Sequence, residues 1–498
     1  MQNLSDDFLR FIFSYLITST VVLPPIFGDP RLSLMAVSPR WRRIILGSSN
    51  LWDTIVILPS SPLLTPGLAK IAEQWLKIHW RNDHILSVFL LQPRHLAHIN
   101  RTWPRDQIQT FRIVEDGILP VARCTTSFSC TLSTNHGVNA FFTIPSRNFS
   151  CLERLELSVP MLPDQELARA IKKAITKESR RFTAFQRLPR LRTAVINIQN
   201  RIHPLAFKIP WQQLTTLDMR NTVLYPRIFL EVLSDSAPSL KHGSFTIQFK
   251  RINCQCSTAS LAPKKIFRTV KLRFLQSLHL RLIDPNHNTR IFSRIHPTAL
   301  LHLRIELDRG SWAMSTYQGL LSNSCKTLKS LALWDAPLQG YQSTETEGPA
   351  LVYTPPCSQK NLDGLFSNLP NLEHVRVPNG VFIPPSAADR IAQGILLPSL
   401  RILEVTSTTG VDILDMVRRR NELTYLRSGW VGSSKSKRSK LDSGMAAGTS
   451  FYPPFFSDVR LLTVSRNRSK VELAKKYLQS SSSSQRTVFD IHYANFAI

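Results

Sequence analysis

A short pattern of apolar residues recurs along most of the chain and restricts what it can fold into. The pattern reads apolar-x-x-apolar-x-apolar, so its second half alternates between apolar and other residues. Such alternation predicts a short β-strand with one face buried. The segments beginning at Trp52 and Leu86 are expected to be the first copies of the pattern. Clear copies begin at Leu152, Leu191, Leu214, Leu275, Leu300, Leu328, Leu372, Leu400 and Val459, and a weaker copy begins at Leu240.

The segments between these copies carry helical periodicity, for example at 229–233, 320–321 and 413–417. One strand and one helix per copy predict an α/β leucine-rich-repeat solenoid, with parallel strands on the concave face and helices outside. Successive copies are 23 to 59 residues apart, against roughly 20–29 in regular repeats, so the array is irregular. A non-repeating α/β domain with leucine-rich strands is the alternative.

The middle apolar residue of a copy and the residue before it are expected to point in opposite directions. Leu217, Leu303, Leu331 and Leu403 take this middle place in four copies and are predicted to share one core. The preceding residues are predicted to lie on the concave face, where we expect a target to bind. These candidate target-face residues are Thr216, His302, Ser330 and Ile402.

The first residues of the chain predict a different kind of unit. Residues 4–16 read LSDDFLRFIFSYL, and Ser5 is expected to cap a helix with an acidic first turn. This helix is apolar on nearly every side, apart from a stripe of Asp7, Arg10 and Ser14. Such a helix must be buried on most sides. A module this small does not cover it alone, so a partner surface is implied.

A second helical segment at 31–46 is followed by a Leu-Trp pair. Together with the first helix it resembles the F-box, whose Leu-Pro-x-Glu and Leu-x-x-Ile-Phe blocks precede Val-Cys-x-x-Trp-x-x-Ile and then Leu-Trp. The chain departs from this pattern at Ser5, Asp7 and Ser38, and its stretch at 17–30 is longer. An ordinary helical cap on a repeat array is the alternative. The matching residues are Leu4, Leu9, Ile12, Phe13, Leu16, Val37, Trp41, Ile44, Leu51 and Trp52.

The order of the parts is similar to the large F-box family of mushroom-forming (basidiomycete) fungi. A predicted helix at 73–80 leads into an alternating segment at 85–90. Residues 209–217 read IPWQQLTTL, which is similar to the Pro-Trp-x-x-Leu-Thr-x-Leu segment of that family. This resemblance in layout covers most of the chain, and the matching phrases are few.

The resemblance implies a substrate-recognition adaptor of an SCF-type ubiquitin ligase, within the ubiquitin conjugation pathway. The F-box would bind a Skp-type adaptor and, through it, a cullin scaffold, while the repeats would bind an unknown target protein. The chain itself would not be an enzyme and would need no cofactor. The expected adaptor-binding residues are Leu4, Leu9, Ile12, Phe13, Leu16, Val37, Trp41 and Ile44.

The net charge of +28 keeps a second hypothesis open, a basic solenoid that binds nucleic acid or acts as a scaffold outside ubiquitination. Basic runs at 435–440 and 418–420 are interpreted as a solvated loop and a charged helix end. A nuclear-import or nucleic-acid patch is the alternative for both. An enzyme with unrecognised residues is the third hypothesis and ranks last.

Motifs for other chemistry are absent from the sequence. There is no Gly-x-x-x-x-Gly-Lys loop, no Gly-x-Gly-x-x-Gly and no Gly-x-Ser-x-Gly. Cys254-x-Cys256 lacks a second ligand pair for zinc, so no catalytic, cofactor-binding or metal residue is assigned. The uncharged run at 11–27 contains two prolines and follows acidic residues. We therefore expect no signal peptide and no membrane span, and an intracellular location in the cytoplasm, the nucleus or both.

These observations predict three parts. An F-box-like helical module occupies 1–52, and a degenerate leucine-rich-repeat solenoid occupies 53–478 with an exposed loop at 433–450. A serine-rich tail or a last strand occupies 479–498.

Overall fold

A computed structural model describes most of the strands and helices that the pattern predicts. The chain divides into two compact units, Met1–Val223 and Leu224–Ile498. The predicted helix at 73–80, Cys254-x-Cys256, the basic run at 435–440 and nearly all of the predicted loop at 433–450 lie outside the described residues. The described residues are 4–17, 20–23, 29–52, 54–57, 86–90, 122, 125–131, 149–159, 184–199, 203–249, 269–283, 289–308, 312, 317–335, 364–378, 381–407, 410–433, 454–463, 468–480 and 487–493.

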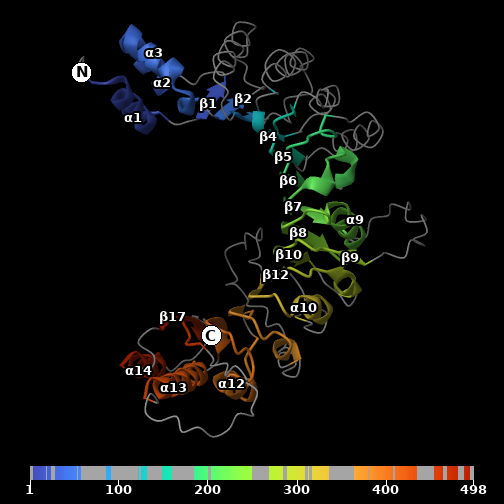
Figure 1. Cartoon of the computed structure of the whole chain (residues 1–498), viewed down its shortest axis with the longest axis vertical. Helices are drawn as coiled ribbons and strands as arrows, with labels where there is room; N and C mark the ends of the chain where they lie inside the picture. Colours follow the sequence, from blue (N-terminus) through green and yellow to red (C-terminus); the bar gives the residue numbers. More distant parts are fainter. Residues whose placement is uncertain are drawn as a thin grey trace, which may run out of the picture. The chain divides into compact units, whose positions relative to one another are not determined.

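Three helices begin the first unit (Figure 1), namely α1 (Asp6–Leu16), α2 (Pro30–Val37) and α3 (Pro39–Gly47). The predicted cap of α1 is confirmed, because the Phe8 N–H donates to the Ser5 hydroxyl oxygen at 3.2 Å. The segment at 31–46 forms two helices because a residue before a proline is disfavoured in helical conformation. Ser38 is extended there and caps α3, accepting the Trp41 N–H at 3.1 Å.

The strands of the first unit follow in chain order, each paired in parallel with the one before. Two short 3-10 helices, at Pro204–Phe207 and Trp211–Gln213, connect the last two of these strands. The strands are β1 (Thr20–Leu23), β2 (Thr54–Ile57), β3 (Leu86–Leu90), β4 (Thr125–Thr131), β5 (Arg154–Val159), β6 (Thr193–Ile198) and β7 (Thr216–Leu224).

The second unit repeats this arrangement in parallel. A separate parallel pair joins β9 (Val270–Lys271) and β11 (Ile295–His296). Of the two alternatives for 479–498, a serine-rich tail or a last strand, the structure shows a strand, β17. The main strands are β8 (His242–Gln248), β10 (Ser277–Ile283), β12 (His302–Leu307), β13 (Ser330–Asp335), β14 (His374–Arg376), β15 (Ile402–Ser407), β16 (Asp458–Thr463) and β17 (Val488–Tyr493).

Helices connect strands in the second unit, and α9 and α10 lie to one side of β8, β10 and β12 (Figure 1). The helical periodicity at 229–233, 320–321 and 413–417 is confirmed by α9, α10 and α13. The α/β class with parallel strands is therefore confirmed. The helices are α9 (Pro226–Ser236), α10 (Gln318–Ser324), α12 (Pro385–Ala392), α13 (Val411–Ser433) and α14 (Arg468–Ser480).

The apolar pattern supplies the core. The middle residues align across strands, Leu303 with Leu331 and Val375 with Leu403 in the second unit, and all are buried. Leu217, in the first unit, aligns with Ala194 and is also buried, so the inward orientation predicted for the four leucines is confirmed. The first residue of each copy is fully buried just before its strand, at Leu152, Leu191, Leu214, Leu240, Leu275, Leu300, Leu328, Leu372 and Leu400.

The last copy of the pattern was predicted in the wrong register. Val459 aligns with Leu403, so it holds the middle place of its copy and not the first. The copy reads Phe456-Val459-Leu461, and all three side chains are buried. Residues 456–464 contain enough apolar residues to satisfy the pattern in two registers, and strand pairing decides between them.

Two strands of the first unit were not predicted. In β4 the first place of the copy is taken by Thr125, which is fully buried, and Phe128 and Cys130 follow at the other two inward places. A threonine at the first place hides this copy from a search for apolar residues. β1 lies within the uncharged run at 11–27, where Val21 aligns with Ile55 of β2 and is buried.

A main-chain motif joins successive copies. The Leu301 carbonyl accepts the N–H groups of Lys329 and Ser330 at 2.9 and 3.0 Å. In turn, the Lys329 carbonyl accepts those of Glu373 and His374 at 2.8 and 2.9 Å. In these copies one carbonyl thus binds two consecutive N–H groups of the next copy. The same arrangement occurs at the carbonyls of Glu153, Arg192, Lys241, Gln276, Glu373 and Arg401.

Truncation of an inward leucine should destabilise the fold. Leu331→Ala removes a side chain that is fully buried between Leu303 and Val375, and we expect it to lower the free energy of unfolding by about 2–5 kcal/mol. His302→Ala, at an exposed outward position, should change it by less than about 0.5 kcal/mol. Urea denaturation followed by circular dichroism measures both. Equal effects of the two variants would contradict the inward assignment.

Candidate functional site

An apolar face of helix α1 is exposed to solvent. Four large side chains at helical spacing form it, Phe8, Phe11, Tyr15 and Leu16, and 57% of Phe11 and 77% of Tyr15 are accessible. Residues four apart lie on one side of a helix, so these side chains form a continuous strip. We call these four residues the α1 face. Contiguous exposed apolar surface marks interaction sites in soluble proteins.

The opposite side of α1 forms the interior of the three-helix module. Leu9 and Phe13 are buried there, together with Ile44 and Ile45 of α3. The Trp41 ring meets the Phe13 ring edge to face, with 5.0 Å between centroids. The module therefore covers one side of α1 by itself and leaves the α1 face uncovered.

The structure sorts the eight predicted adaptor-binding residues into three groups. Leu9, Phe13 and Ile44 are buried in the module interior, where they support the helices and do not reach solvent. Leu16 and Val37 are exposed. Leu4, Ile12 and Trp41 are half-buried.

Three residues of the α1 face, Phe8, Phe11 and Tyr15, were not among the predicted adaptor-binding residues. Because the helix is apolar nearly all round, its sequence did not indicate which side packs inward. The packing of Phe13 against Trp41 decides this.

A buried arginine attaches the helical module to the first strands. Arg31 of α2 donates from Nε to the Leu51 carbonyl at 3.0 Å and from Nη2 to the Thr20 carbonyl at 3.1 Å. Its guanidinium also pairs with Asp29 at 3.1 Å and lies over the Trp52 ring. Burial lowers the pKa of Arg31, although Asp29 opposes this effect. Removing one partner of a buried ion pair is strongly destabilising, so Arg31 holds α2, β1 and the turn before β2 together.

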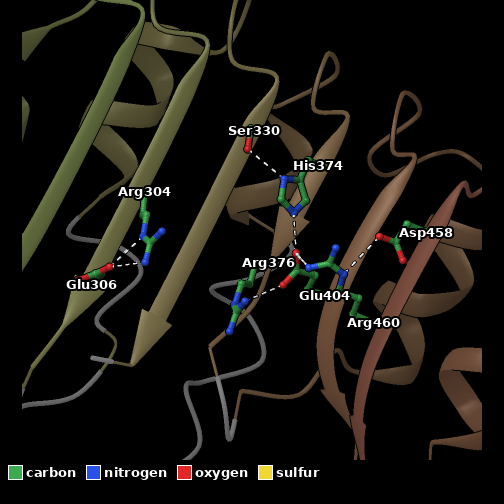
Figure 2. A network of polar contacts seen from close by, with 8 residues as sticks. All are labelled: Arg304, Glu306, Ser330, His374, Arg376, Glu404, Asp458 and Arg460. Atoms are coloured by element: carbon green, nitrogen blue, oxygen red, sulfur yellow. Dashed lines mark hydrogen bonds and ion pairs between the residues drawn. The ribbon is translucent and has the colours of Figure 1, made fainter. Parts of the chain in front are cut away.

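A second candidate surface lies on the outward side of strands β12 to β16 in the second unit (Figure 2). Glu404 of β15 is its centre. It accepts hydrogen bonds from His374 Nε2 at 3.2 Å and from Arg376 Nη1 at 2.7 Å, and it lies 3.5 Å from Arg460 Nη1. Arg460 also pairs with Asp458 at 3.3 Å. We call this set, together with Arg304, Glu306 and Ser330, the strand-face network.

Two arginines of this network enclose a tryptophan. The guanidinium carbons of Arg304 and Arg376 lie 4.5 and 3.0 Å from the centroid of the Trp334 ring. Arg304 is also held by Glu306, with its Nε 2.9 Å from Oε1. Stacking on an aromatic ring and pairing with a carboxylate both restrict the guanidinium. The two arginine side chains are therefore held in place before any partner arrives.

Ser330, His374 and Glu404 form a hydrogen-bonded chain in the order of a nucleophile, a base and a carboxylate (Figure 2). The Ser330 hydroxyl lies 3.2 Å from His374 Nδ1. However, the N–H groups of Ser330 and His374 donate to main-chain carbonyls of the preceding copies. These donors are thus not available to stabilise an oxyanion. Glu404 also shares its charge with two arginines, so we interpret the chain as a polar link between strands.

The predicted target-face residues point away from the core, as the alternation of side chains along a strand predicts. His302, Ser330 and Ile402 are outward. Together with His374 they are successive register partners on neighbouring strands, in the order His302, Ser330, His374 and Ile402. Thr216 holds the equivalent outward place in the first unit.

The charged residues two positions further along β12, β14, β15 and β16 were missed. These four residues, Arg304, Arg376, Glu404 and Arg460, form half of the strand-face network. Charge at alternate positions of successive copies was the available signal, but spacing alone does not show which charges pair.

The basic run at 418–420 does not form a cationic patch. Arg418 pairs with Asp415 and Glu422, and Arg419 pairs with Asp389. The interpretation of this run as a charged helix end is wrong, because it lies within α13 and Arg420 packs inward. Its side chain is buried, and burial lowers its pKa to about 10.

The buried guanidinium of Arg420 binds the loop that follows α12. It donates to the carbonyls of Ile391, Leu397, Pro398 and Leu400. Leu397 has a left-handed φ of 49°, which is unfavourable for a branched side chain. Arg420 therefore stabilises this strained loop and has a structural role.

Comparisons with known proteins give no relative: no family model matches the chain, and no curated protein matches it significantly. Within the described ranges, no helix is both long enough and apolar enough to cross a membrane. In the same ranges, no three histidine, cysteine or acidic side chains gather as metal ligands do.

The stability that Glu404 provides should depend on pH. The hydrogen bond from His374 is the main cause that lowers the pKa of Glu404, and the charges of Arg376 and Arg460 lower it further against the effect of burial. A carboxyl whose pKa is lower in the folded state stabilises the fold above its unfolded pKa, and this contribution is lost as the pH falls. Glu404→Gln should cost about 1 kcal/mol at pH 7, and this difference should shrink below about pH 4.

The matched control is Glu231→Gln, in an exposed ion pair with Arg227 on α9. We expect its effect to stay below about 0.5 kcal/mol at every pH. Thermal unfolding of the three proteins between pH 3 and pH 8 measures both differences. A Glu404→Gln effect that does not change with pH would show that its carboxylate charge does not contribute.

Proposed function

We propose that this protein is a substrate-recognition adaptor of an SCF-type ubiquitin ligase. Helices α1 to α3 form an F-box-like module that binds a Skp-type adaptor, which connects it to a cullin scaffold. The strand-and-helix copies form a leucine-rich-repeat solenoid whose outward strand face binds the target protein. The resemblance to the F-box family of mushroom-forming fungi and the exposed surfaces of the chain support this proposal together.

The observation that carries the proposal is the exposure of the α1 face. The module buries Leu9 and Phe13 and leaves Phe8, Phe11 and Tyr15 in water. Removing such side chains from water is worth roughly 1.5–3 kcal/mol each. A partner that covers this strip gains much of that free energy. Val37, on α2, adds a further exposed apolar side chain to the same module.

The attachment by Arg31 fits the role of an adaptor. A protein that brings a target to a ubiquitin donor works by proximity, and proximity depends on a stiff connection between docking module and recognition surface. Arg31 ties α2 to the main chain of β1 and of the turn before β2. The chemistry then belongs to other subunits, and we assign no catalytic residue or cofactor to this chain. The role places the protein inside the cell.

The alternative is a basic scaffold that binds nucleic acid, and the net charge of +28 favours it. In the basic run at 418–420, however, Arg418 and Arg419 are paired with carboxylates that are more exposed than the arginines, and Arg420 is buried. A phosphate backbone would meet paired and not unpaired cations there. We therefore rank this alternative second.

Removing the α1 face should abolish adaptor binding without unfolding the protein. The variant Phe11→Ser/Tyr15→Ser alters two exposed side chains and leaves Leu9 and Phe13 in place. We expect pull-down of a purified Skp-type adaptor to weaken about 100-fold or more, because about 3 kcal/mol or more of apolar burial is lost.

The matched control is Leu473→Ser/Tyr477→Ser on α14, which has the same spacing and exposed side chains. This variant should bind the adaptor as the unaltered chain does. Circular dichroism checks that both variants are folded. Undiminished pull-down by the α1 variant, or an equal loss with the α14 variant, would rule out docking through α1. Salt-resistant binding of nucleic acid without adaptor binding would favour the scaffold alternative.

A further inference from the structure

The ion pairs of the strand face share an orientation. The arginine reaches into solvent, and its carboxylate partner lies closer to the sheet. The Arg304 side chain is 44% exposed against 16% for Glu306, and Arg460 is 52% exposed against 12% for Glu404. Arg376 with Glu404 and Arg281 with Asp308 follow the same order. A molecule that approaches this face meets guanidinium groups first.

The length of the arginine side chain does not explain this orientation by itself. In most of the ion pairs on described helices the carboxylate is the more exposed partner. This holds for Arg10 with Asp7, Arg40 with Asp6, Arg418 with Asp415 and with Glu422, and Arg419 with Asp389. Arg227 with Glu231 on α9 has the opposite order. The outward direction of the cations is thus a consistent feature of the strand face.

The exposed arginines are regularly spaced. Arg304, Arg376 and Arg460 lie in one register row, on β12, β14 and β16, with Ala332 and Glu404 on the strands between them. Neighbouring strands are about 4.8 Å apart, so the three arginines recur about every 10 Å across the sheet. A peptide in the polyproline II conformation advances about 3.1 Å per residue and has three residues per turn. Such a peptide running across the strands therefore presents every third side chain to the arginines, at a spacing of about 9 Å.

Each guanidinium keeps donors for a ligand. It carries five N–H groups in a planar fork that matches carboxylate geometry. Arg376 directs one hydrogen bond to Glu404, at 2.7 Å. Trp334 lies between Arg304 and Arg376 and holds both in position, which reduces the entropy lost on binding. Tryptophan and arginine are also the side chains that dominate protein interfaces.

We propose that the strand face from β12 to β16 binds an acidic peptide segment of a partner protein, whose carboxylates are received by Arg304, Arg376 and Arg460. The inference rests on the proposed function for the role of this face and adds the chemistry of the target. The half-buried carboxylates keep the arginines in place, and the outward cations select a partner of negative charge.

A labelled peptide with glutamate at every third position, separated by serines, tests this inference with the full chain. Fluorescence anisotropy at physiological salt measures its binding. We expect Arg304→Gln and Arg460→Gln each to weaken binding about fivefold or more, because a charged hydrogen bond is lost. Arg227→Gln, on α9, removes the same charge from an exposed ion pair and should leave binding unchanged within about twofold. Arg460→Gln alters an exposed side chain and remains informative if Arg304→Gln is unstable.

Several results would overturn the inference. They are an absence of peptide binding to the unaltered chain, equal binding of a peptide with glutamine in place of glutamate, or an equal loss with Arg227→Gln. Displacement of the peptide by single-stranded DNA at physiological salt would assign the face to nucleic acid instead. Adaptor pull-down is measured separately. Peptide binding that depends on Arg304 and Arg460 without adaptor binding would refute the proposed function alone, and adaptor binding without peptide binding would refute this inference alone.

Discussion

A carbonyl group just before most of the strands from β5 to β15 is the constraint on which the rest of the fold depends. It accepts two consecutive N–H groups of the next copy, as Leu301 does for Lys329 and Ser330. Both partners are main-chain groups, so the link imposes no residue type. Regular arrays often use a repeated polar side chain in this region, and no asparagine ladder is evident in this sequence. The main-chain link explains how copies that begin 23 to 56 residues apart (Leu191 to Leu214, Leu400 to Phe456) can still stack in register.

The register of the strands then determines which residues of each strand are buried and which face outward. Since side chains alternate across a strand, aligning the middle apolar residues places every second residue on the outward side. Charges that are far apart in the sequence become neighbours in this way. Arg376 and Glu404 are 28 residues apart in sequence and 2.7 Å apart in the structure. The strand-face network is therefore a consequence of the same hydrogen bonds that form the sheet.

The packing of the helical module differs from that of the strands, because it leaves part of its apolar surface uncovered. Helix α1 has more apolar surface than three short helices can cover, and the interior takes only Leu9, Phe13 and their neighbours. The apolar residues that remain form an exposed strip in place of a larger core. Arg31 makes this arrangement rigid because its guanidinium donates to the main-chain carbonyls of Leu51 and Thr20. This side chain thus joins the helical module to the first strands.

The sequence by itself determined the parallel α/β class, the N-cap of α1 and the inward direction of the leucines, because each depends on local spacing. It did not determine the register of the last copy, where residues 456–464 satisfy the pattern twice, nor β4, where buried Thr125 replaces a leucine. Only the tertiary structure decided which side of α1 packs inward and which arginines pair with Glu404. Those outcomes depend on contacts between residues far apart in the chain, and a pattern of local spacing carries no information about them.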